Sequence, residues 1–190
     1  RAQFTATALR KARRMKSLVE ELFEVTRFNV SRIELHKEPV RAGIMLRQLG
    51  EEMAPVLEAR RQNIAFDIRE NTTLFADPGK LARAVDNVLH NASSYAPEGA
   101  TVRVACEESG GWGIIRISNE GAEIPQAELD RYFEKFYRGD GARQTGTGGS
   151  GLGLAIAKNI VEAHGGSIAA HNENRVTTFT IAVPQGQRPA

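Results

Sequence analysis

A glycine-rich segment that runs directly into an apolar helical pattern constrains the fold of this chain more than any other feature. Residues 147–158 read TGGSGLGLAIAK, and Leu152, Ile156 and Ile160 follow at helical spacing. Glycines let a backbone approach a phosphate closely, and the free amides of a helix start supply donors and a positive dipole end. Taken alone, the segment is also compatible with a flexible linker, although that interpretation is the less favoured one.

A second helical segment lies upstream, over residues 77–92. Asp77 is suited to the N-cap and Pro78 to the first helical position. Asn87 and Asn91 are four residues apart and therefore lie on one face, where an amide oxygen is a suitable ligand for Mg²⁺. On its own, the amide pair is also typical of an ordinary helix surface. The opposite face has an apolar stripe, which consists of Leu81, Val85, Val88, Leu89 and Ala92.

Together, the two segments resemble parts of the catalytic, ATP-binding domain of sensor histidine kinases. That domain belongs to a larger group with the gyrase, chaperone and mismatch-repair ATPases (GHKL). Four motifs follow in the family's order: an N box at 87–95, a first glycine box at 118–125, an F box at 132–138 and a second glycine box at 148–154. The resemblance spans roughly residues 33–184. It implies an α+β fold, a two-layer α/β sandwich with helices on one face of a mixed, mostly antiparallel sheet.

The resemblance also implies a site for ATP and Mg²⁺. Asn91 would hold the Mg²⁺ that bridges the phosphates, and Tyr95 would line the adenine pocket. Asn119 would accept a hydrogen bond from the adenine amino group, and residues 138–149 would form a lid over the phosphates. The full set of residues predicted to bind ATP is Asn87, Asn91, Tyr95, Asn119, Gly121, Ile124, Phe136, Arg138, Gly149, Gly151, Leu152, Gly153 and Leu154.

Three positions depart from the family pattern and make the nucleotide affinity uncertain. Asn119 replaces an aspartate, so the bond to the base would be weaker because the partner is neutral. Glu123 replaces a glycine of the first glycine box, and Ser94 replaces a lysine that often reaches the phosphates. Candidates to supply the missing positive charge, each also compatible with a solvated surface role, are Arg138, Arg143 and His90.

Residues 1–31 are expected to form a long helix that precedes the catalytic domain. Apolar residues alternate at spacings of four and three, which is typical of a coiled-coil or bundle seam. By resemblance, this helix is the second one of the dimerisation and phosphoacceptor hairpin, residues 32–186 are the catalytic domain, and 187–190 are a tail. The expected partners are the other hairpin helix, which is missing from this chain, a second copy in the full-length homodimer, and a response regulator. None of the four histidines has the setting of a phosphoacceptor, although His164 stands at a helix end where positive charge is favourable.

Composition narrows the remaining classes of function. With 190 residues, 41% of them hydrophobic, the chain can bury one sizeable core. The single cysteine, Cys106, is expected to be a buried apolar residue in a reducing compartment.

No run of apolar residues is long enough for a membrane span, so we expect no direct membrane insertion of this segment. We expect the segment to be the cytoplasmic portion of a membrane sensor. Residues 1–16 carry six basic groups and no acidic one. Because no aromatic residues or recognition motif accompany them, nucleic acid is not an expected partner.

The pattern predicts the following elements, with Trp112 in the core. Strands are expected near 33–35, 64–68, 72–76, 101–107, 112–118, 167–171 and 177–183. Helices are expected over 42–62, where Pro55 is a possible interruption, over 77–92, 126–136 and 150–164.

We expect the domain to transfer the γ-phosphoryl group of ATP to a histidine outside this chain, and onward to a response-regulator aspartate. Two alternatives remain: a GHKL ATP hydrolase, and a nucleotide-binding scaffold without catalysis. Hydrolases of the group usually carry a glutamate general base where Asn87 stands, four residues before Asn91, and an amide cannot take that proton. The runs 18–29 and 136–143 are similar to vancomycin-resistance sensor kinases.

Overall fold

The computed structural model describes residues 33–69, 72–139 and 150–185, together with three isolated positions at 12, 15 and 19. The predicted N-terminal helix as a whole, most of the lid and the C-terminal tail therefore lie outside the described residues. The elements in chain order are β1 (Glu38–Arg41), α2 (Ala42–Ala59), β2 (Asn63–Ile68), β3 (Thr73–Ala76), α3 (Pro78–Tyr95), β4 (Thr101–Ser109), β5 (Trp112–Glu120), α4 (Gln126–Arg131), α6 (Gly153–Ala163), β6 (Ser167–Glu173) and β7 (Val176–Pro184).

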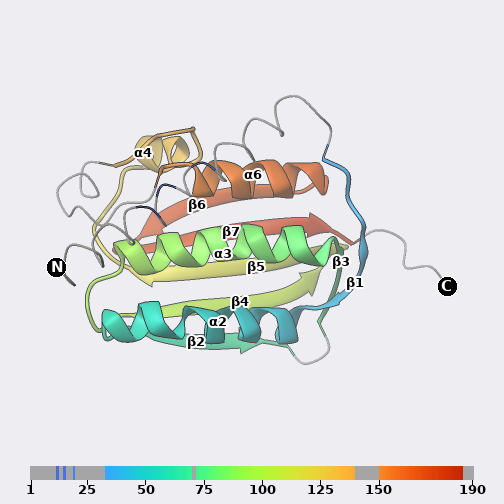
Figure 1. Ribbon diagram of the computed structural model, residues 1–190, viewed down its shortest axis with the longest axis horizontal. Coiled ribbons are helices and arrows are strands. Elements are labelled where there is room, and N and C mark those ends of the chain that lie inside the picture. Colours follow the sequence, from blue (N-terminus) through green and yellow to red (C-terminus); the bar gives the residue numbers. More distant parts are fainter. Residues whose placement is uncertain are drawn as a thin grey trace.

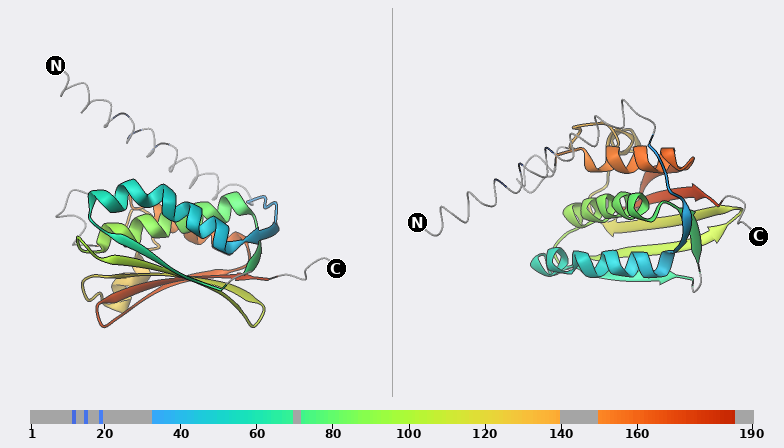
Figure 2. Two further views of the ribbon diagram at one scale, coloured as in Figure 1. Left: turned by 90° about the horizontal axis from the view of Figure 1, so that it is seen from below. Right: turned by 45° about the vertical axis from the view of Figure 1, so that its right-hand side comes forward.

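Five strands form one sheet in the order β2-β4-β5-β7-β6. β2 and β4 are parallel, whereas the other three pairs are antiparallel. Figure 1 shows α2, α3 and α6 side by side across this sheet, and Figure 2 shows that they lie on the same face. β1 and β3 form a separate two-stranded sheet at one end. The predicted two-layer sandwich with a mixed, mostly antiparallel sheet is confirmed.

The core fills the space between the sheet and these helices. In β5 and β7 every second residue is buried, as expected for strands with one face toward the helices. Complete burial of a large aliphatic or aromatic side chain contributes about 1.5–3 kcal/mol, so this layer is the main source of stability. The whole predicted stripe of α3 is buried, together with Ile115, Ile117, Ile156, Ile160, Phe179 and Ile181.

The start of α3 is fixed as predicted. Asp77 is the N-cap, and its Oδ1 accepts a hydrogen bond from the Lys80 amide at 3.0 Å. The other carboxylate oxygen accepts from the His36 amide and from the Lys80 ammonium, at 3.1 and 3.0 Å. Burial raises the pKa of Asp77, but the bonds from Lys80 and His36 outweigh it and lower the pKa to about 2.

The prediction that His164 places a favourable charge at the end of α6 is wrong. Its side chain is buried, and burial lowers its pKa, so the ring is neutral at neutral pH. The ring Nδ1 lies 2.8 Å from the Ile160 carbonyl, and Nε2 accepts a hydrogen bond from the Asp77 amide at 3.0 Å. The imidazole thus joins the end of α6 to the start of α3.

Several predicted boundaries were wrong. The first strand begins at Glu38, not near 33–35, because it pairs with β3 from Glu38↔Ala76 onward. α2 ends at Ala59 and continues through Pro55, which faces solvent, where the carbonyl that loses its partner can be hydrated. α4 ends at Arg131, five residues before the predicted end, and α6 begins at Gly153.

Trp112 was also predicted wrongly. Its side chain is 41% exposed because it starts β5 on the strand face opposite to the buried residues Gly113 and Ile115.

Cys106 is buried as expected, and burial raises the pKa of its thiol to about 11. Among the described residues, no helix combines the length and the apolar character needed to cross a membrane.

Candidate functional site

The fold brings all four motifs together where α3 ends and α6 begins. A Cβ placed on Gly153 would lie 3.2 Å from Asn87 Oδ1, so the second glycine box contacts the N box. A Cβ placed on Gly121 would lie 3.3 Å from the Tyr95 carbonyl oxygen, so the first glycine box reaches the last turn of α3. Figure 1 shows this end of α3, the start of α6 and α4 on the same side of the molecule.

Asn119 offers an unused acceptor at this place. The residue is 3% exposed, and its Nδ2 donates to the Glu120 carbonyl at 3.0 Å. Its Oδ1 is buried and has no hydrogen-bond partner in the described part of the chain. Leaving a buried acceptor unsatisfied costs about 1–3 kcal/mol, which a ligand donor would recover. The predicted bond from an adenine amino group would need such an acceptor.

The two asparagines of α3 occupy different settings. Asn87 Nδ2 is buried and has no hydrogen-bond partner among the described residues. Asn91 lies one turn closer to the helix end, where it is half-buried. An amide oxygen is a hard ligand of the kind that Mg²⁺ takes alongside phosphate oxygens and water. The residues present therefore fit both a nucleotide and its Mg²⁺.

Gly151 joins the second glycine box to the F box. Its φ is +77°, and a Cβ there would lie 2.9 Å from both the Phe136 carbonyl carbon and the Tyr137 carbonyl oxygen. The Phe136 amide donates to the Gly151 carbonyl at 2.9 Å. Phe136 itself has a φ of +64° and is 62% exposed. The contact requires glycine at position 151 and leaves the predicted Phe136 ring on the surface.

The start of α6 has the features that favour an anion. Among the described residues, no side chain caps the N-cap position and the first turn has no acidic residue. The Leu152 amide donates to Ser150 Oγ at 3.1 Å. The Leu152 and Leu154 side chains are buried in the core. Of these two predicted residues, only the backbone is therefore suited to contact a phosphate, through amides that the helix leaves unpaired.

An aromatic cluster borders the end of α3. The rings of Tyr95 and Tyr132 lie 5.7 Å apart, and those of Tyr132 and Tyr137 lie 5.9 Å apart. Burial raises the pKa of Tyr95, while the Arg138 charge nearby lowers it. The predicted residues Tyr95 and Arg138 are thus neighbours. Ile124, also predicted, is half-buried against the core.

The departures from the family pattern have simple structural settings. Glu123 is exposed, and its backbone does not adopt the positive φ that would require glycine. The Ser94 hydroxyl donates back to the His90 carbonyl at 2.7 Å, and the His90 ring lies 3.5 Å from Asp86. Of the three candidates for the positive charge, Arg138 and His90 are described, whereas Arg143 lies outside the described residues, as does the predicted Gly149.

Two residues that bond to this region were not predicted, because no sequence motif marks them. Arg60 and Gln62, from the connection between α2 and β2, bind carbonyl groups at the end of α3. They precede α3 by more than ten residues, so only the tertiary structure reveals them.

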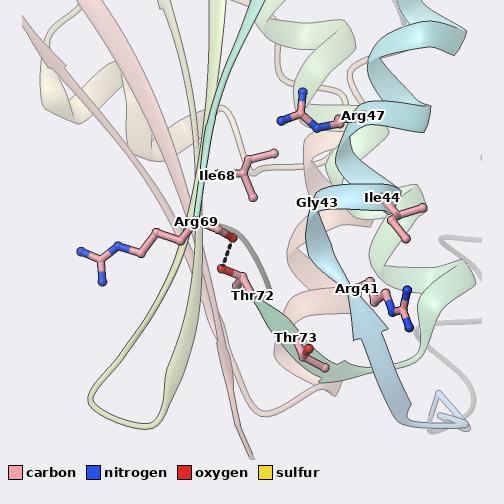
Figure 3. A pocket seen from close by; sticks show the side chains of 8 residues that line it. All are labelled: Arg41, Gly43, Ile44, Arg47, Ile68, Arg69, Thr72 and Thr73. Carbon is pink, nitrogen blue, oxygen red and sulfur yellow. Dashed lines mark hydrogen bonds between the residues drawn. The ribbon is translucent and has the colours of Figure 1, made fainter.

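A cavity of about 570 Å³ lies elsewhere, between the start of α2, the end of β2 and the start of β3. Figure 3 shows that the Arg41 and Arg69 side chains extend to opposite sides, and that the Thr72 hydroxyl donates to the Arg69 carbonyl. This cavity adjoins β1 and β3, the end from which α3 starts, so it is separate from the candidate site.

The family described as "Histidine kinase-, DNA gyrase B-, and HSP90-like ATPase" matches residues 76–187. This chain belongs to that ATPase family. It is 40% identical over 184 residues to the sensor protein VanS of Enterococcus faecium, which covers 97% of this chain and 48% of VanS. The chain thus spans about half the length of this relative. The predicted resemblance to sensor histidine kinases, and to the vancomycin-resistance (VanS-like) kinases among them, is confirmed.

Solved structures agree with this assignment. Full-length ShkA in complex with AMPPNP has a TM-score of 0.83 at 27% identity, covering 96% of this chain and 38% of ShkA. The histidine kinase ThkA in complex with the response regulator TrrA has a TM-score of 0.78 at 18% identity, covering 98% and 52%. The second likeness shows the fold alone. The domain is thus the ATP-binding catalytic domain of the sensor-kinase type.

Proposed function

We propose that the site at the end of α3 binds MgATP and presents its γ-phosphoryl group to a histidine outside this chain. The unpartnered, buried Oδ1 of Asn119 is the observation that carries the proposal. An acceptor held in this way selects a base with an amino group, and the phosphates would then extend toward the amides at the start of α6. ShkA, which shares the fold, was solved with an ATP analogue.

The side chains of this domain act by positioning and by neutralising charge, which account for most of the catalysis of phosphoryl transfer. Asn91 would hold the Mg²⁺, whose charge neutralises the phosphate oxygens when bound. Arg138 and the free α6 amides would stabilise the remaining negative charge. A histidine ring nitrogen then bonds to the γ-phosphorus while the bond to the bridging oxygen breaks, and ADP leaves. A response-regulator aspartate oxygen would later displace that nitrogen.

Asn87 favours phosphotransfer over hydrolysis. A hydrolase needs a base to take a proton from water, and the amide of Asn87 cannot do so. Asn87 lies against Gly153, within the site, so an amide stands where a hydrolase of the group would place its base.

The partners and location of the whole protein follow from the same proposal. ThkA has been solved with a response regulator, and we infer a partner of that class for this domain. We also infer that the domain acts on a phosphoacceptor helix and that the whole protein is a homodimer. We infer further that the domain lies in the cytoplasm, as part of a membrane sensor. VanS is itself named a sensor protein.

Calorimetric titration of a non-hydrolysable ATP analogue tests the proposal. The parent chain should bind it with Mg²⁺ and lose most affinity with EDTA. Asn91→Ala should weaken binding at least about tenfold, the loss expected for a metal ligand or its close partner. Asn63→Ala, an exposed asparagine at the start of β2, is the matched control and should bind like the parent. Absence of binding by the parent chain would refute the proposal.

A further inference from the structure

The last turn of α3 is capped only in part by its own sequence. Ala96 follows it in an extended conformation instead of a left-handed glycine, and the turn has no basic residue. The last four carbonyls of a helix have no partner within it, and a local cap usually satisfies them. Here the adjacent sequence satisfies only the first of them, since the Ala96 amide donates to the Ala92 carbonyl at 3.0 Å. Tyr95, the predicted base contact, ends this turn, and Asn91, the predicted Mg²⁺ ligand, lies four residues before it.

Side chains from the connection between α2 and β2 supply the missing cap. Gln62 is 6% exposed, and its Nε2 lies 3.0 Å from the Ser93 and Ala96 carbonyl oxygens and 3.1 Å from that of Pro97. Its Oε1 accepts a hydrogen bond from the Ser93 hydroxyl at 2.7 Å. Both the nitrogen and the oxygen of the buried Gln62 side-chain amide therefore form hydrogen bonds at the end of α3.

Arg60 extends the same arrangement. Its Nη2 donates to the Ser94 carbonyl at 3.1 Å and to the Ala96 carbonyl at 3.2 Å. The Tyr95 carbonyl lies between these bonds and faces Gly121 of the first glycine box. The last turn is thus held from one side by Arg60 and Gln62 while its other side contacts the candidate site.

From this arrangement we infer that Gln62 is a positioning residue of the nucleotide site. It keeps the last turn of α3 formed in the free protein, so that Asn91 and Tyr95 are in place before the nucleotide arrives. The inference rests on the proposed function. Helix ends fray easily, and the apparent dissociation constant rises in inverse proportion to the fraction of molecules that are competent to bind. A turn formed in a tenth of the molecules would weaken binding about tenfold.

Gln62→Glu tests this role. The substitution keeps the size and the acceptor for Ser93, but it removes the donors and places a carboxylate against three carbonyl oxygens. We expect the dissociation constant of the Mg²⁺-loaded ATP analogue to rise about tenfold. Hydrogen exchange should accelerate in residues 91–96 and not in α6. Gln62→Met, which removes the donors without adding charge, should act in the same direction and serves if Gln62→Glu does not fold.

Val183→Ala is the control for a general loss of stability. Val183 is fully buried in β7, in the part of the strand paired with the start of β5. At a temperature where all variants are folded, it should leave the dissociation constant within about twofold of the parent, since distant sites act independently. Equal weakening in Val183→Ala, or unchanged binding in both Gln62 variants, would overturn the role of Gln62. Absence of binding by the parent would instead refute the proposed function, and this role with it.

Discussion

Gly151→Ala should destabilise this protein through two separable effects. Gly151 has a φ of +77°, and placing alanine in the left-handed region costs about 1–2 kcal/mol. In addition, the new Cβ would lie 2.9 Å from backbone atoms of Phe136 and Tyr137, which must move. Forced displacement in a packed region costs about 1–3 kcal/mol. The total loss of unfolding free energy is therefore about 2–5 kcal/mol.

Gly111→Ala isolates the backbone effect. Gly111 has nearly the same φ, +79°, but nothing lies within 4 Å of its added Cβ. This variant should lose only about 1–2 kcal/mol. Urea unfolding measures both, and with a slope of about 2 kcal/mol per molar the midpoints of the two variants should differ by roughly 0.5–1.5 M.

Equal midpoints for the two variants would refute the argument that the F box and the second glycine box are in close contact. A second readout is nucleotide binding. Gly151→Ala should weaken it, because the start of α6 must shift, whereas Gly111→Ala should leave it unchanged because that turn lies between β4 and β5.

In calorimetric titration, Asn119→Asp should bind the ATP analogue about three- to tenfold more tightly than the parent, because a charged acceptor strengthens the bond to the base. Weaker binding would contradict the assigned orientation of Asn119. For His164, burial lowers the pKa of the folded state below the usual 6.5, so the unfolded chain takes up the proton first and stability should fall as the pH drops below 6.5, by up to about 1.4 kcal/mol per pH unit. In urea unfolding between pH 7 and 5, the unfolding free energy of His164→Gln should change less steeply with pH than that of the parent. An equally steep change would show that another group is responsible.

The elements that were predicted well are those whose signal is local. The cap at Asp77, the proline at position 78 and the apolar stripe of α3 depend on residues within a few turns of one another. The alternation in β5 and β7 likewise reflects one buried face. By contrast, the shorter α4 and the displaced first strand depend on partners distant in sequence, such as β3 for β1.

The candidate site shows the same division. The resemblance of the sequence motifs to the sensor-kinase family predicts Asn87, Asn91 and Asn119 as candidates. The sequence does not show that the Leu152 and Leu154 side chains face the core, nor that the His164 ring is buried between two helix ends. Each of these depends on what packs against the residue from another element.

Four short motifs in the sequence are enough to predict the family by resemblance, and with it the two-layer architecture and the residue types proposed for the nucleotide site. Each motif lies within one segment, so it can be found without knowledge of the fold. The folded structure was needed to show that Asn119 Oδ1 has no hydrogen-bond partner among the described residues and that Gln62 bonds to the end of α3. A buried polar atom is satisfied by whichever group the fold places beside it, and that group need not be near it in the chain.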